Sequence, residues 1–116
     1  MRTLLAGLLL LATPAVPAQI RAVAPAVAPG TNSVYSAGVD AGDYLYVSGQ
    51  GPRRPDGTLP ATFATPVRQA LDNLKSVVQA AGLTMEHVVY TQVYLEDISK
   101  FREVDAVFSQ VFPNSP

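Results

Sequence analysis

The strongest local constraint in this sequence is a helical pattern between residues 65 and 82. Thr65 can cap the helix, Pro66 suits its first position, and Gly82 suits the residue just past its end. Apolar residues recur with spacings of four, three, four and three, at Val67, Leu71, Leu74, Val78 and Ala81. The polar residues fall largely on the outer face: Arg68, Asp72, Asn73, Lys75 and Gln79. A helix with one apolar stripe needs a second layer to bury it.

Runs typical of strands precede this helix. Residues 34–39 and 44–47 are predicted to form a hairpin, because the connector Asp40–Asp43 contains the Asp and Gly that short hairpin loops prefer. Residues 44–47 are apolar and aromatic, so we expect a central strand covered on both faces. Upstream, the Ala-, Pro- and Val-rich residues 20–29 are either a spacer or an edge strand.

A third strand and a second helix are expected downstream. Residues 87–95 are β-branched and aromatic, which favours a strand. Asp97 or Ser99 can cap the following helix, and Pro113 closes it. Its buried stripe is predicted to be Phe101, Val104, Phe108, Val111 and Phe112. The order predicts an α+β domain, a sheet covered on one face by two helices. Two such helices need more strand area than three strands supply, so we expect the last strand or strands to be missing.

Residues 1–18 have the layout of a secretory signal peptide. Arg2 gives a positive start, residues 4–12 form an apolar run too short to span a bilayer, and small residues at Val16 and Ala18 offer a cleavage site. The alternatives are an uncleaved membrane anchor and a chance leucine-rich start. We therefore expect export, to the periplasm, of a domain comprising residues 19–116, with no membrane attachment after cleavage.

The composition of the chain excludes some classes of function. The chain is 48% hydrophobic and 15% charged, as a globular protein is. Its formal net charge is −1, and it becomes −2 when Arg2 is removed with the leader. No basic patch is present, which argues against nucleic-acid binding. Cysteine is absent and His87 is the only histidine, so the sequence offers no metal-ligand cluster.

The stretch "YLYVSGQGP", residues 44–52, turns abruptly from strand-like to polar and glycine-rich. It either ends a strand, the commoner use of such residues, or builds a site. Arg53 and Arg54, which follow it, are interpreted as part of a solvated loop with a turn at Asp56–Gly57. We interpret His87 as the start of a strand and Asp97 as a helix cap.

An ordered set of segments resembles the RidA family of YjgF-type imine deaminases. The segments are "VYSAGVDAGDYLYVSGQGP", "RQALDNLKSVVQAAG", "VVYTQVYLEDISKF" and "FPNSP", and together they span residues 34–116. No single motif is specific, but the order and spacing are. The resemblance implies a chorismate-mutase-like α+β fold and a homotrimer with ligand clefts between subunits. It implies no metal or organic cofactor.

The resemblance also implies an activity and a site. Family members hydrolyse reactive 2-imino acids, or their enamine tautomers, to 2-keto acids and ammonia. Tyr35 and Ser48 match catalytic positions, and both also line the cleft with Gly49 and Gln50. The alternative is that Tyr35 fills the core or a subunit interface.

Departures from the family pattern leave a second function open. Asp105 stands where the family has a cleft-lining Asn, and a carboxylate there would repel a carboxylate-bearing substrate unless protonated or paired. The resemblance places a substrate-anchoring Arg and a Glu beyond Pro116. We therefore expect residues 19–116 alone to be poorly soluble and inactive. The alternative to an enzyme is a non-catalytic small-ligand-binding protein on the same trimer.

Overall fold

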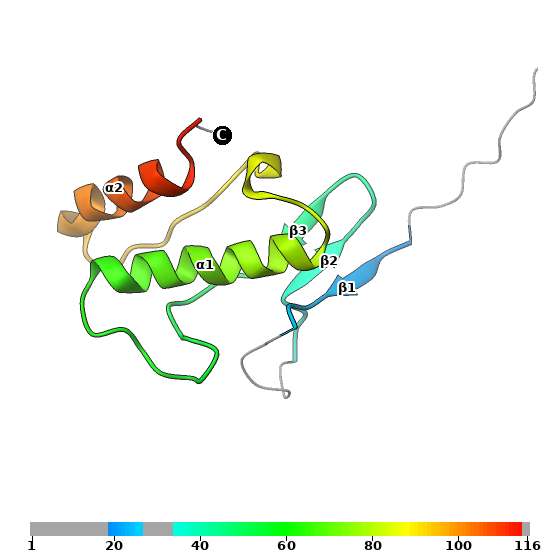
Figure 1. Ribbon diagram of the computed structural model, residues 1–116, viewed down its shortest axis with the longest axis horizontal. Coiled ribbons are helices and arrows are strands. Elements are labelled where there is room, and N and C mark those ends of the chain that lie inside the picture. Colours follow the sequence, from blue (N-terminus) through cyan, green and yellow to red (C-terminus); the bar gives the residue numbers. More distant parts are fainter. Residues whose placement is uncertain (1–18, 27–33, 115–116) are drawn as a thin grey trace, which may run out of the picture.

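The computed structural model describes residues 19–26 and 34–114, so the predicted leader, residues 1–18, lies outside the described residues. An antiparallel sheet has the order β1-β2-β3, with β1 at Arg21–Val23, β2 at Gly38–Asp40 and β3 at Leu45–Val47. The helices are α1, Ala64–Ala80, and α2, Phe101–Val111, with short 3-10 turns at Met85–His87 (η1) and Ile98–Lys100 (η2) (Figure 1). The predicted α+β class is confirmed.

The predicted hairpin is present as β2 and β3, which pair with Gly38 opposite Val47. Gly42 in its connector has φ of 91°, and its N–H donates to Asp40 Oδ1 at 3.0 Å. On the other side of β2, the short β1 pairs with Arg21 opposite Asp40, and their side chains form a 3.1 Å ion pair. Of the two readings of residues 20–29, the described part is therefore an edge strand.

The two ends of α1 differ in how well the sequence predicts them. The proposed cap at Thr65 is wrong: the helix begins at Ala64 with Phe63 at the capping position, and Thr65 Oγ1 lies 2.8 Å from Thr62 Oγ1 instead. The end at Gly82 is confirmed. Gly82 has φ of 78° and donates to the carbonyl of Gln79, while Leu83 donates to that of Val78, which is a Schellman motif.

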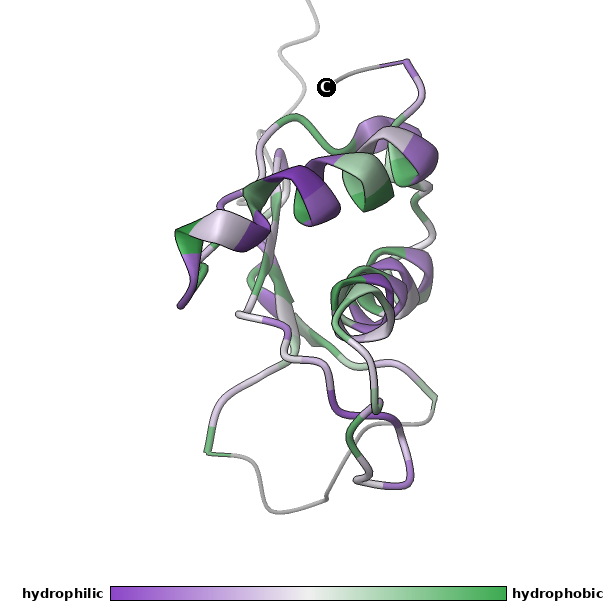
Figure 2. Ribbon diagram, turned by 90° about the vertical axis from the view of Figure 1, so that its left-hand side faces the viewer, coloured by the Kyte–Doolittle hydropathy of each residue, from purple (hydrophilic) through white to green (hydrophobic). Residues whose placement is uncertain are grey.

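The core lies where α1 packs against β3 and α2 packs against α1. In Figure 2, α1 is seen nearly end-on with α2 above it. Val77 is the most deeply buried side chain, at 1% exposure, and a Cβ on Gly38 would lie only 2.8 Å from its Cγ1. Glycine is therefore required where β2 meets the helix. The buried apolar residues are Val23, Leu71, Val77, Val78, Val104 and Val107.

Two predictions about strands are wrong. Residues 44–47 are not covered on both faces, because Tyr44 and Tyr46 are 61% and 64% exposed. Residues 87–95 are not assigned as a strand: His87 belongs to η1, and residues 88–95 form no ladder within the described part of the chain. In that part β3 pairs only with β2. Strand propensity alone does not give a strand when no neighbour accepts its hydrogen bonds.

The second helix ends as predicted, but its start and its buried stripe depart from the prediction, because Lys100 stands at its capping position without a side-chain cap. Asp97 accepts a hydrogen bond from the N–H of Ser99 and so caps η2, which leads directly into α2. α2 ends at Val111, two residues before Pro113. Val104 is buried as expected. Phe101, predicted to be buried, is 58% exposed, and Val107, which was not predicted, is buried. No helix among the residues described is long and apolar enough to cross a membrane.

Candidate functional site at the end of β3

Ser48 joins the end of β3 to the segment that precedes β2. Its N–H donates to the carbonyl of Ala37 at 2.9 Å, which extends the hairpin ladder by one bond. Its Oγ donates to the carbonyl of Ser36 at 2.5 Å. The residue before Ser36 is Tyr35, whose side chain is 66% exposed. The structure therefore brings the two predicted catalytic residues, Tyr35 and Ser48, to the same end of the hairpin.

The residues after Ser48 form an open loop. Gln50 Nε2 donates to the carbonyl of Ser48 at 2.8 Å, which ties the Gln50 side chain to the start of the loop. At Gly49 and Gly51 no atom lies within 4 Å of where a Cβ would stand. The main chain at both glycines can therefore be approached closely by a ligand or by another surface.

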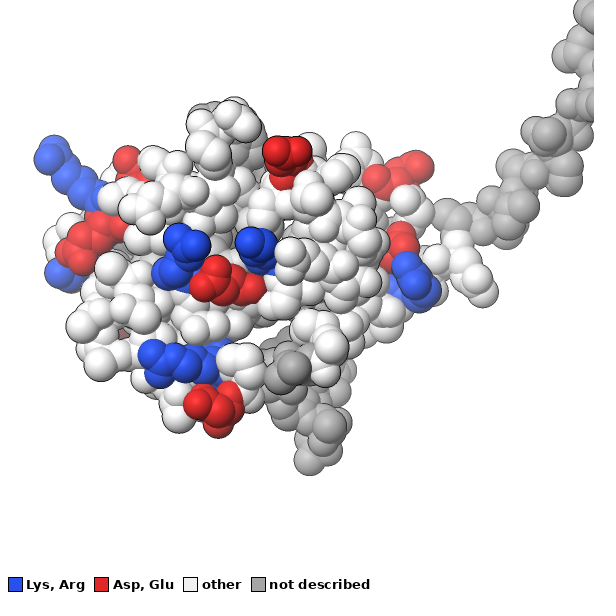
Figure 3. All heavy atoms as spheres, in the orientation of Figure 1, with Lys and Arg blue, Asp and Glu red and all other residues white. Residues whose placement is uncertain are grey.

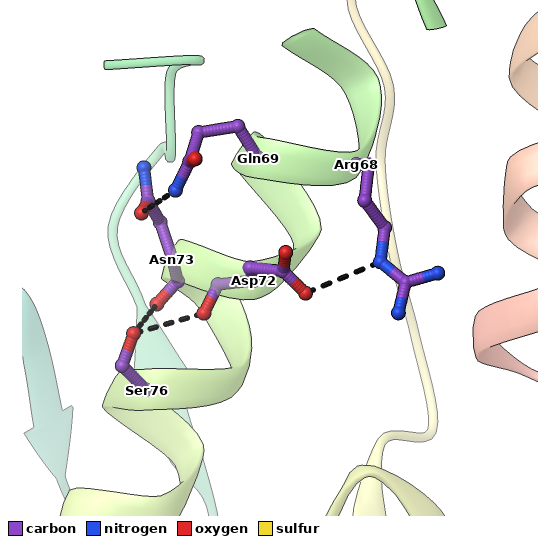
Figure 4. Close-up of polar contacts among 5 residues, drawn as sticks. All are labelled: Arg68, Gln69, Asp72, Asn73 and Ser76. Atoms are coloured by element: carbon purple, nitrogen blue, oxygen red, sulfur yellow. Dashed lines mark hydrogen bonds and ion pairs between the residues drawn. The ribbon is translucent and has the colours of Figure 1, made fainter. Parts of the chain in front are cut away.

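Helix α1 holds the far end of this loop through one side chain. Asn73 Nδ2 donates to the carbonyl of Gly51 at 2.9 Å and to that of Arg53 at 2.8 Å. Gln69, one turn earlier, donates from Nε2 to Asn73 Oδ1 at 3.0 Å (Figure 4). Asn73, expected on the outer face, is half-buried there and bonds to this loop. The sequence offers one sign of this role. Asn has a poor helix propensity, so an Asn in the middle of a helix raises the question of whether its side chain makes a specific hydrogen bond.

Two hollows lie near these elements, and they differ in size. A cavity of about 50 Å³ lies between the loop and α1, lined by Ala37, Gln50, Asn73 and Val77 among others. It is well below the roughly 300–1,000 Å³ of typical ligand pockets. A groove of about 890 Å³ runs between α1, residues 84–88 and the end of α2. None of the predicted site residues lines that groove.

Asp105 is not joined to the Tyr35–Ser48 end by any contact described. It is exposed on α2, and its main-chain carbonyl accepts a hydrogen bond from Ser109 Oγ at 2.9 Å. Within the described part of the chain its carboxylate makes no hydrogen bond or ion pair. Arg53 donates to the carbonyl of Gly57 at 3.0 Å, inside its own exposed loop, which agrees with the reading of that segment as a solvated turn.

The comparisons with known proteins identify the family. A family model described as "Endoribonuclease L-PSP" matches residues 25–116. The Escherichia coli 2-iminobutanoate/2-iminopropanoate deaminase is 39% identical over 93 residues, which cover 79% of this chain and 73% of that protein. The chain belongs to the RidA family. A RutC family protein of Saccharolobus solfataricus is 38% identical, over 77% of this chain and 72% of its own length.

Solved RidA-family structures have the same fold. The crystal structure of the E. coli YjgF gene product matches with a TM-score of 0.77 and 37% identity, over 83% of this chain and 78% of that one. E. coli TdcF with bound serine matches with a TM-score of 0.75 and 33% identity, over 80% and 74% of the two chains. The predicted family and fold are confirmed, and the named relatives support a RidA-like deaminase of reactive intermediates acting on small molecules.

Three aspartates of this RidA-family chain have a lowered pKa, and each accepts hydrogen bonds in a turn or at a helix cap. The pKa of Asp40 is lowered by the N–H of Gly42 and then by Arg21. Thr58 lowers the pKa of Asp56 through its N–H and hydroxyl, and Ser99 lowers that of Asp97. Each holds local backbone geometry away from Ser48. Among the residues described, no group of three acidic or histidine side chains is placed to hold a metal ion.

His87 also has a local structural role. Its Nδ1 lies 3.1 Å from the N of Thr84 and 3.0 Å from the Oγ1 of Thr84, which completes a capping box at the start of η1. The interpretation of His87 as a strand-start residue is therefore wrong, although its role is structural as expected. The Nδ1 of this single histidine is therefore occupied by Thr84 in a turn.

Proposed function

We propose that this RidA-family protein hydrolyses reactive 2-imino acids, or their enamine tautomers, to 2-keto acids and ammonia. The observation that carries the proposal is the 39% identity, over 93 residues, to a protein named 2-iminobutanoate/2-iminopropanoate deaminase. The Tyr35–Ser48 end of the hairpin supports it, because it joins polar side chains to an open main chain at Gly49.

In this reaction a water oxygen bonds to the imine carbon while a proton passes to the nitrogen, giving a carbinolamine. The C–N bond then breaks and its electron pair stays with the nitrogen. The hydroxyl proton of the carbinolamine passes to that nitrogen, which leaves as ammonia, and the oxygen becomes the keto oxygen. The Ser48 hydroxyl donates its proton to the Ser36 carbonyl, so toward a substrate its oxygen acts as an acceptor. It suits an N–H of the imine or carbinolamine, or the attacking water. Tyr35 supplies a phenol that can donate to the developing oxygen.

The pocket is proposed to be completed by a second subunit of a homotrimer. The cavity beside the loop is only about 50 Å³, while Gly49 and Gly51 are open on their outer side. A neighbouring surface placed over these glycines would create a cleft of ligand size. Light scattering coupled to size-exclusion chromatography tests this part, and a monomer mass would contradict it.

The activity is tested with an imino acid generated in situ by an amino-acid oxidase. The expected result is 2-keto acid and ammonia release faster than in buffer, with the excess rate lost in Tyr35→Phe and Ser48→Ala. A rate equal to that in buffer would overturn the proposal. No added metal or organic cofactor is expected to be needed, so the assay is run with and without a chelator.

A second candidate is a non-catalytic protein that binds small amino-acid-like ligands. The solved TdcF structure with bound serine favours it, since that relative holds a small zwitterion. Asp105 supports it as well, because a carboxylate in place of an amide would alter the site's preference for anionic substrates. A rise in melting temperature with serine or a 2-keto acid, without turnover of the imine, would select this function.

Export is a further part of the proposal and rests on the leader-like residues 1–18. Fractionation of cells expressing the whole chain tests it, with a protein beginning at Gln19 in the periplasm as the expected result. Binding of nucleic acid is not proposed. The formal net charge is −1, and lysines and arginines lie among carboxylates on the face seen in Figure 3 rather than in a basic patch.

A further inference from the structure

The polar face of α1 ties the helix to the loop after β3. We propose that Asn73 is a positioning residue, which sets the geometry of the Ser48–Gln50 segment for ligands without touching them. The inference rests on the proposed function, since it assigns that segment to the deaminase site. Asn73 was predicted to be a surface residue, and its contacts instead make it a bridge between α1 and the candidate site.

The contacts of Asn73 are suited to holding this particular loop. Its amide donates to the carbonyls of Gly51 and Arg53, at 2.9 and 2.8 Å, which lie on either side of Pro52. Proline has no N–H, so the loop cannot be fixed there by a main-chain donor of its own. An amide has two N–H groups, and a single Nδ2 can therefore satisfy both carbonyls.

Gln69 fixes which way the Asn73 amide points. It donates to Asn73 Oδ1 at 3.0 Å from one helical turn away. If the Asn73 amide were flipped, its oxygen would face the two loop carbonyls and both bonds would be lost. The Gln69–Asn73 pair, called the clamp below, therefore holds the Asn73 amide in the orientation in which Nδ2 faces the two loop carbonyls.

The clamp lies next to the most deeply buried side chain of the part of the chain that the structure describes. Val77, one turn after Asn73, is the most buried side chain and packs where Gly38 allows β2 to approach. At the near end of the loop, Ser48 is bonded to Ser36 and Gln50 to Ser48. The Ser48–Gln50 segment is thus held by bonds to the hairpin at its start and by the bonds of Asn73 on α1 just after its end. Loss of either set of bonds would let the segment move.

The test is the variant Asn73→Asp, which keeps the shape of the side chain but presents a carboxylate to two carbonyl oxygens. The matched control is Asp72→Asn, the reverse change at the adjacent exposed position. We expect Asn73→Asp to raise the KM for the imino acid about tenfold, as for the loss of two hydrogen bonds, with kcat changed less. Gln69→Leu should raise it less, and Asp72→Asn should leave it unchanged.

A second measurement does not depend on the reaction. In 1H–15N NMR spectra, the amide resonances of Gly49 and Gly51 should shift in Asn73→Asp and stay in place in Asp72→Asn. If the wild-type protein shows no imine hydrolysis, the proposed function fails, and these resonances still decide the role of Asn73. The inference is overturned if the KM and both glycine resonances are unchanged in Asn73→Asp, or if they change equally in Asp72→Asn.

Discussion

The hydroxyl of Ser48 and the main-chain carbonyl of Ser36 are joined by a 2.5 Å hydrogen bond, which ties the end of β3 to the residue after Tyr35. This bond joins the polar, glycine-rich end of β3 to Ser36, twelve residues earlier, and so to the neighbouring Tyr35. Ser48 therefore has two roles. Its hydroxyl holds the end of the hairpin, and its oxygen is proposed to accept a hydrogen bond from the substrate or the attacking water.

Ser48→Ala is therefore expected to reduce both stability and activity. Loss of one half-buried hydrogen bond should lower the free energy of unfolding by about 1 kcal/mol. The loss of kcat/KM for the imino acid should be at least tenfold, beyond what this destabilisation explains. Chemical denaturation and the ammonia-release assay measure the two effects. Ser109→Ala, at an exposed α2 residue, is the control, and an equal effect from it would argue against a site at Ser48.

Gly38→Ala is expected to destabilise the fold without touching the site directly. The new Cβ would stand 2.8 Å from Val77 Cγ1, so either the Val77 side chain or the packing of α1 on the sheet must shift. Overpacking of this kind typically costs about 1–3 kcal/mol. The same change at Gly49, where nothing lies within 4 Å, should cost far less.

A double mutant identifies the contact behind that effect. Val77→Ala removes the methyl group that the new Cβ at position 38 would meet, although it leaves a cavity of its own. Gly38→Ala should therefore cost less in the Val77→Ala background than in the wild type, as measured by urea denaturation. Additive free energies for the two changes would show that the close approach is not what requires glycine.

The sequence predicted those elements whose signals are local. The hairpin follows from the Asp40–Asp43 connector, and the end of α1 follows from Gly82, whose φ of 78° favours glycine. In the same way, Asp97 could be recognised as a cap because it bonds the N–H of Ser99, two residues away. Each of these features is fixed by chemistry within four residues, so the sequence alone contains the information.

Some of the failures, at Thr65 and His87, involve partners only three residues away, but those that bear on the site depend on contacts distant in sequence. Whether residues 88–95 form a strand depends on a neighbour to pair with, which propensity cannot supply. Asn73 looks like a surface residue on a helical wheel, because the carbonyls it binds are 20 and 22 residues away. Tyr35 and Ser48 were placed together only through the family resemblance, since nothing in either segment alone predicts the bond at Ser36.

Asp40 gives a pH-dependent prediction. Its pKa lies below the ordinary 3.8, because the Gly42 N–H and the Arg21 guanidinium favour the carboxylate. A lowered folded-state pKa adds stability that is present above the unfolded value and is lost as pH falls through the folded one. The ionised Asp40 should therefore stabilise the pairing of β1 with β2 at neutral pH, and this contribution should disappear in acid.

The measurement compares the wild type with Asp40→Asn by urea denaturation across pH. Asn keeps an acceptor for Gly42 but carries no charge for Arg21. The wild type should be the more stable at pH 6. The difference should shrink as the pH falls below 3.8, and it should be lost once the pH is below the lowered pKa of the folded Asp40. A difference independent of pH would contradict the assignment. Because the Arg21–Asp40 pair is exposed, the effect should be small and should weaken in high salt.

Asp105 provides the test of specificity. If its carboxylate lines a cleft formed with a neighbouring subunit, it repels a substrate that carries a carboxylate, and Asp105→Asn should lower the KM for 2-imino acids several-fold. The carboxylate makes no hydrogen bond or ion pair in the described part of the chain, so its removal should leave stability nearly unchanged. Glu96→Gln removes the same charge at another exposed position. Equal effects of the two variants on the KM would show that Asp105 acts only through the net charge. A lower KM in Asp105→Asn alone, with a difference that high salt weakens, would show that Asp105 lies at the ligand.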